Sequence, residues 1–228
     1  MKNKSAFTMI EIVFVIVVLG ILASLAMGRM DRDLQQEAAE TILSHIRLTQ
    51  QLALRDNKHR SDNDENWQRA YWRIQFKNCN MQGDVQPIYN VGSDLDLSGS
   101  DISKEEAALD PISGKYLYAT CLETSLADDV SQDIRIGKKF GVSGVTLSGC
   151  STRGGSSANQ IAFDYLGRPH RGVTAYTSNA DFNKLVRSDC LVNIQLSTDQ
   201  DNDGTLDSIV INVERETGHA FIVGHETL

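Results

Sequence analysis

The sequence predicts an α+β protein in which one long N-terminal helical spine packs on a mainly antiparallel, β-rich globular head. Two observations carry this prediction. Residues 7–57 lack proline and keep a helical spacing of apolar side chains, whereas short alternating segments follow residue 66. No helical segment long enough for a crossover connection lies among the later strands, so we expect antiparallel pairing.

The first part of the spine is the apolar run 7–27, FTMIEIVFVIVVLGILASLAM, which follows the basic leader MKNKSA. At 1.5 Å per residue, a helix of this length spans roughly 30 Å, the thickness of a bilayer hydrocarbon core. We therefore expect residues 7–27 to form a transmembrane helix. Its one ionisable side chain, Glu11, is costly in lipid, so it indicates either a role in assembly or a plain signal anchor with Glu11 near the interface.

The second part of the spine, residues 28–57, is amphipathic. Leu34, Ala38, Ile42, Ile46 and Ala53 recur at steps of three and four, with charged residues between them. This spacing predicts that the membrane helix continues into one spine of roughly 50 residues. The alternative is two separate helices with a break at the glycine at position 28.

The start of the apolar run, Phe7-Thr-Met-Ile-Glu11, resembles the prepilin processing signal of type IV pilins and type II secretion pseudopilins. The resemblance implies that a prepilin peptidase cuts between Ala6 and Phe7 and that the new amino terminus is methylated. It also implies that Glu11, the fifth residue of the mature chain, guides assembly. Ala6 and Met9 depart from the Gly and Leu that are more frequent in the family.

Charge and cysteine content indicate where the head lies. The formal charge of the 228-residue chain is −8, and the leader carries Lys2 and Lys4, so the positive-inside rule keeps the N-terminus cytoplasmic. We expect a single pass through the inner membrane with residues 58–228 in the periplasm, where disulfides are stable. The four cysteines allow three pairings, and we favour Cys79–Cys121 with Cys150–Cys190 because each closes a loop within a contiguous block. Free buried thiols are the alternative for either pair.

The head begins with a polar linker at 57–66 and then changes to strand patterns. A short helix is expected at 103–109, because Ser103 and Glu106 have the spacing of a capping box. Alternation and turn residues predict strands at 70–77, 85–91, 115–121, 142–148, 160–165, 172–176, 191–197, 208–214 and 220–223.

Two segments of the head, from Ile161 to Pro169 and from Ile209 to Gly218, resemble the strand–turn patterns of minor pseudopilins of the GspH/FimT type. A β-hairpin alone explains the same residues, with Gly167 supplying a turn.

An acidic segment between two predicted strands predicts a calcium site. Asp199, Asp201, Asp203 and Asp207 place oxygen donors at positions 1, 3, 5 and 9 of a loop whose sixth residue is glycine, and Thr205 offers its backbone carbonyl at position 7. The spacing resembles DxDxDGxxD calcium loops of extracellular proteins. It departs from the EF-hand at position 12, which is valine instead of glutamate. The alternative is a solvated acidic turn.

The basic residues are concentrated in residues 135–188, which have a local formal charge of +6. Within this region we single out Arg168, Arg171, Lys184 and Arg187 as a patch that could contact DNA phosphates. The alternative is a surface that contacts an acidic neighbouring subunit.

No catalytic pattern is evident. The five histidines lack metal-ligand spacing, and the sequence has neither a P-loop nor a nucleophile elbow. The prediction is a non-catalytic subunit, a minor pseudopilin of a type II secretion-like system or a minor type IV pilin. Its implied partners are other pilins or pseudopilins, prepilin peptidase, the assembly platform and membrane lipid. The alternative function is a DNA-binding minor pilin that acts in DNA uptake, and a third option is an anchored periplasmic enzyme.

Overall fold

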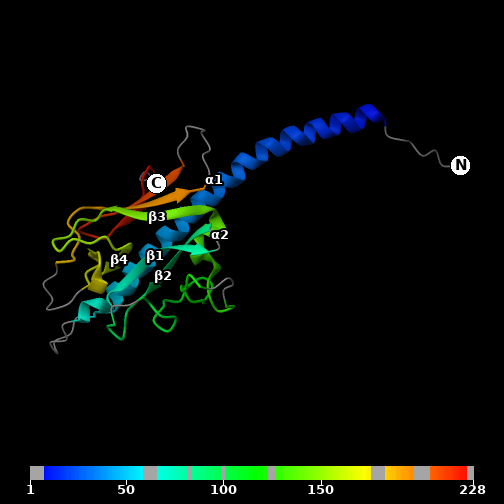
Figure 1. The fold of residues 1–228 in the computed structure, drawn as a ribbon. Coiled ribbons are helices and arrows are strands. Elements are labelled where there is room, and N and C mark those ends of the chain that lie inside the picture. Colours follow the sequence, from blue (N-terminus) through cyan, green and yellow to red (C-terminus); the bar gives the residue numbers. More distant parts are fainter. Residues whose placement is uncertain are drawn as a thin grey trace.

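The computed structural model describes residues 8–58, 66–81, 84–98, 101–122, 127–175, 183–197 and 206–224. Its first element is the helix α1, Met9–Arg55, which is continuous through the glycine at position 28. The prediction of one spine is therefore confirmed over the alternative of two helices. The N-terminal half of α1 projects away from the head, and the C-terminal half lies inside it (Figure 1).

The C-terminal half of α1 supplies part of the head's hydrophobic core. Its buried apolar residues recur at helical spacing, so they form one face of the helix: Ala38, Ala39, Ile42, Leu43, Ile46 and Ala53. This face contacts strands of both sheets described below. Any fragment that begins after α1 would therefore lack a wall of the core.

The structure describes the expected membrane span, residues 7–27, from residue 8 onward. Among the residues that the structure describes, no helix combines the length and apolarity required to cross a membrane.

The head contains two four-stranded sheets in which all pairs of named strands are antiparallel, as predicted. The first sheet has the order β2-β1-β4-β5. Its strands are β1 (Trp72–Met81), β2 (Asp84–Gly92), β4 (Gln160–Phe163) and β5 (Pro169–His170).

The second sheet has the order β3-β6-β7-β8. Its strands are β3 (Val142–Gly149), β6 (Cys190–Leu196), β7 (Ser208–Val213) and β8 (Ala220–Ile222). Strand β6 alternates between buried and less buried residues, which is the pattern of a strand with one face on the core.

Short helices complete the fold. They are the 3₁₀ helices η1 (Trp67–Ala70), η2 (Gln132–Ile134) and η3 (Val173–Ala175) and the α-helix α2 (Ile136–Phe140). The helix α2 was not predicted from the sequence, although Ile136 and Phe140 are both buried one turn apart and Gly141 ends the helix with a φ of 70°. That left-handed conformation favours glycine.

Two expected elements between β2 and β3 are wrong. At 103–109 the Ser103–Glu106 capping contacts do form, with the Ser103 amide 2.9 Å from Glu106 Oε2. No helix follows, because the Ala108 amide donates to Val91 of β2 instead of to the preceding turn. At 115–121 no strand forms, because Leu117 bonds to both Ala108 and Val91 and makes no continuous ladder with one partner.

The strand expected at 172–176 is also wrong in its described part, where η3 stands at Val173–Ala175. Gly172 has a φ of +77°, which an extended strand does not use. The sequence analysis likewise missed β5, a strand of two residues.

The disulfides join the cysteines of the expected pairing, Cys79 to Cys121 and Cys150 to Cys190. The first ties β1 to the segment between β2 and β3. The second joins the end of β3 to the start of β6, where Gly149 and Cys190 are already paired. The first bond therefore fastens a sheet to a neighbouring piece of chain, and the second reinforces a strand pair within the second sheet.

Candidate functional site

The N-terminal part of α1 begins with a local hydrogen-bonded turn. Thr8 is the N-cap, and Glu11 follows in the first turn. Glu11 Oε2 accepts from the Thr8 backbone amide at 2.9 Å and from the Thr8 hydroxyl at 2.8 Å. A carboxylate in this position satisfies amide groups that have no partner within the helix. The isolated chain thus uses Glu11 to start its own helix, and the predicted cut site, Ala6 and Phe7, lies outside the described residues.

The side chains that follow form an apolar surface with no cover from the head. Twelve large apolar residues are between 37 % and 87 % exposed: Met9, Ile10, Ile12, Val13, Phe14, Val15, Ile16, Val17, Val18, Leu19, Ile21 and Leu22. Exposed apolar area of this extent marks an interaction site or a membrane contact. Burial of such a surface contributes about 25 cal/mol per Å². Glu11 is the single ionisable group within this surface.

The calcium prediction falls mostly outside the described residues. Asp199, Asp201, Asp203 and Thr205 lie there, and Asp207 is the one predicted ligand that is described. The Asp207 carbonyl accepts from the Leu196 amide at 2.9 Å. This bond lies next to Gln195 and Ser208, the pair of β6 and β7 nearest the connecting segment. The described end of the acidic segment, Asp207, is thus held by the second sheet.

A different carboxylate cluster, which the sequence analysis missed, lies within the described residues. Asp94, Asp96 and Glu106 bring one oxygen each within 4.8 Å of one another. These oxygens organise the local backbone, since Glu106 Oε1 accepts from the Leu95 amide at 2.8 Å and Asp96 Oδ1 accepts from the Ser98 amide at 2.9 Å. Asp94 and Asp96 are neighbours in sequence, but Glu106 lies ten positions beyond Asp96, so no local spacing pattern could have revealed the cluster.

The predicted basic patch is largely engaged in contacts within the protein. Arg168 donates to buried Asp164 at 2.9 Å through Nε. Arg171 and Lys184 are 9 % exposed, and both donate to backbone carbonyls, those of residues 158 and 155. Arg187 is the exposed member. A phosphate backbone would have to compete with these internal partners.

Asp164 is a buried carboxylate with several hydrogen-bond partners, within the turn between β4 and β5. It accepts from the backbone amides of Leu166 and Arg168 at 3.0 and 2.9 Å and lies 3.2 Å from His170 Nε2. Burial alone would raise the pKa of Asp164, but bonds to His170 and Arg168 outweigh it and hold that pKa below its usual range. Burial lowers the pKa of His170. These bonds stabilise the turn between β4 and β5.

Comparison with known proteins identifies the N-terminal segment. Residues 1–27 match the family described as the prokaryotic N-terminal methylation motif, the prepilin-type signal of type IV pilins and pseudopilins. No curated protein and no solved structure matches the chain. The match covers the leader, the predicted cut site and Glu11, and it supports a pilin-like or pseudopilin subunit with a structural role.

Proposed function

We propose that the protein is a minor pseudopilin of a type II secretion-like system or a minor type IV pilin, assembled through α1. The observation that carries this proposal is the coincidence of the methylation motif with an unpartnered apolar helix surface. A folded head does not need that surface, since its core is complete without residues 9–22. The surface therefore serves contacts outside the isolated chain.

The proposed sequence of events starts in the inner membrane, which supplies an apolar environment for residues 9–22 while the head lies in the periplasm. Prepilin peptidase cuts between Ala6 and Phe7, and the new amino terminus is methylated. The apolar surface then leaves lipid and packs against α1 of other subunits. The protein acts on no substrate, and a separate ATPase drives assembly.

Glu11 has a defined part in this proposal. Among packed apolar helices, a carboxylate is stabilised only if a cationic partner reaches it. The positively charged amino group of Phe7 on an adjacent subunit is such a partner, and pairing it with Glu11 fixes the register of the two helices. In the assembly, Glu11 would then either bond to both Thr8 and this amino group or exchange its hydrogen bond with Thr8 for the amino group.

The test is the variant Glu11→Ala in cells that contain the assembly machinery. We expect mass spectrometry to show that residues 1–6 have been removed. We also expect an unchanged melting temperature of the head, because the Glu11 side chain bonds to Thr8, outside the head. We expect loss of the variant from the assembled fraction. The control Glu216→Ala removes an exposed carboxylate from the head and should assemble normally. Normal assembly of Glu11→Ala would refute the proposal.

A further inference from the structure

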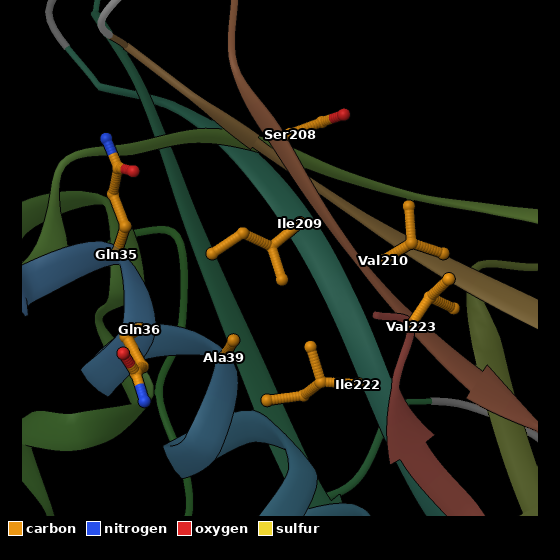
Figure 2. A pocket seen from close by; sticks show the side chains of 8 residues that line it. All are labelled: Gln35, Gln36, Ala39, Ser208, Ile209, Val210, Ile222 and Val223. Atoms are coloured by element: carbon orange, nitrogen blue, oxygen red, sulfur yellow. The ribbon is translucent and has the colours of Figure 1, made fainter. Parts of the chain in front are cut away.

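A cavity that the proposed function does not use lies between the C-terminal half of α1 and the connection from β2 to β3. Its volume is about 220 Å³, and four carboxylates line it. Glu37 and Glu40 come from α1, Asp110 from the connection, and Asp133 from η2. We call it the acidic cavity. The cavity in Figure 2, between α1 and strands β7 and β8, is different, because none of its eight lining residues is ionisable.

The negative charge of the acidic cavity is only partly neutralised. Lys139 forms ion pairs with Asp133 and with Glu37, whose Oε1 lies 3.5 Å from the lysine Nζ. Asp110 Oδ1 accepts from the Ile112 amide at 3.0 Å, which fixes the turn but adds no positive charge. Within the described ranges, Lys139 is the one cation paired with these four carboxylates, so they retain a formal charge of −3.

A buried histidine indicates a ligand independently of these charges. His45 lines the acidic cavity although only 5 % of it is exposed. Its Nδ1 lies 2.6 Å from the hydroxyl of Tyr89, which is fully buried in the core. No residue in the described part of the chain bonds to the other ring nitrogen, Nε2. With the proton on Nδ1, Nε2 is an acceptor, and a donor in the cavity would remove the cost of leaving it unpaired.

The acceptors of the acidic cavity are too far apart for a bare metal ion. Among the described residues, three ligating groups come within 4.8 Å of one another at Asp94, Asp96 and Glu106, and not in this cavity. A guanidinium group is a better match, because its five N–H donors point outward in a fixed fork. It can therefore bond to several carboxylates that do not converge on one point.

Beside the acidic cavity, the surface of α1 becomes more apolar. A hollow of about 320 Å³ shares Glu40 with the cavity and is also lined by Leu43, Leu48 and Pro111. Arg47 lies on the same lining, but its guanidinium is held by the backbone carbonyl of residue 220, at 2.8 Å from Nη2. The apolar side chains can contact a hydrocarbon stem that carries the cation.

We propose that the acidic cavity binds a guanidinium group on an alkyl stem, the chemistry of an arginine side chain or of a free alkylguanidine. Glu37, Glu40 and Asp133 accept its N–H groups, and the stem lies along the apolar hollow. Charge-assisted bonds of this forked kind are stronger than neutral ones. The site is on the half of α1 that lies in the head, so it goes beyond the proposed function and does not depend on it.

The test is calorimetric titration of the purified full chain in detergent with butylguanidine hydrochloride and, in parallel, with its neutral analogue butylurea. We expect the first to bind and the second not to bind. Glu37→Gln/Glu40→Gln should weaken binding about tenfold, and both side chains are exposed, so the fold is retained. The matched control Glu105→Gln/Glu216→Gln makes the same change in charge at exposed positions outside the cavity lining and should bind like the original chain.

A second titration distinguishes the two sources of the group. It uses an end-blocked peptide with one arginine between glycines, and the same peptide with citrulline as the neutral control. Binding of both butylguanidine and the arginine peptide supports the site and assigns it to a partner protein, whereas binding of butylguanidine alone supports it and assigns it to a free alkylguanidine. Silence of both probes, binding of butylurea, or equal weakening in the two double variants overturns the proposal. None of these results bears on the proposed function, because the titrations involve no assembly.

Discussion

At the scale of single residues, buried polar groups determine how the head responds to substitution and to pH. Asp164 is fully buried and accepts bonds from two backbone amides and two side chains. Asp164→Ala removes every one of these bonds, including the contact with buried His170. We expect the free energy of unfolding to fall by about 3 kcal/mol.

Urea unfolding of the full chain in detergent measures this loss. Asp129→Ala is the matched control, because Asp129 pairs with Lys104 at the surface at 2.7 Å, where an ion pair stabilises little. Equal losses for the two variants would show that the bonds of Asp164 do not stabilise the turn.

The buried histidines predict a loss of stability in mild acid. Burial lowers the pKa values of His45 and His170 from the usual 6.5, although nearby carboxylates oppose that shift. Below about pH 6.5 the unfolded chain therefore binds more protons than the folded chain, and the free energy of unfolding falls as the pH is lowered. Thermal melts from pH 7.5 to pH 5 measure this trend. A constant melting temperature across this range would contradict neutral, buried histidines.

At the scale of elements, α1 combines two kinds of surface in one helix. Ile42 is fully buried against the sheets, whereas Ile16 is 63 % exposed. Ile42→Ala should cost about 2–5 kcal/mol of head stability, because it leaves a cavity. Ile16→Ala should leave head stability unchanged and lower recovery in the assembled fraction. Chemical unfolding and fractionation of the same two variants separate the roles, and a reversed pattern would refute the division.

The disulfides make a second prediction at this scale. They span 42 and 40 residues, so the chain-entropy relation assigns each a stabilisation of about 4 kcal/mol. We expect each double variant, Cys79→Ala/Cys121→Ala or Cys150→Ala/Cys190→Ala, to have a similarly reduced free energy of unfolding, measured with urea. A loss confined to one pair would show that strain or residual structure outweighs loop length.

The sequence predicted the long elements better than the short ones. The apolar face of α1 repeats over several turns, and strands β1, β6 and β7 show clear alternation, so local pattern was enough. The predictions for segments 103–109 and 115–121 were wrong because the backbone of each segment bonds to distant parts of the chain. Both segments bond to β2, and they also bond to each other. The Asp94–Asp96–Glu106 cluster was missed for the same reason.

At the scale of the whole molecule, the calcium site predicted at Asp199 to Asp207 would link ion binding to the stability of the second sheet. Its ends join β6 to β7, so a bound calcium would stabilise the folded state by mass action. We expect the melting temperature of the full chain to rise with calcium and to fall with a chelator. Asp201→Asn should reduce the response. An identical melt with and without chelator would indicate a solvated acidic turn.

The continuity of α1 also has a mechanical consequence. A force that pulls on the N-terminal half is transmitted without an intervening hinge to the face formed by Ala38, Ile42 and Ile46. To extract that rod, the force must slide it lengthwise past both sheets and shear many contacts at once instead of peeling them one by one. Tension along an assembled fibre would therefore be resisted by the interior of every head.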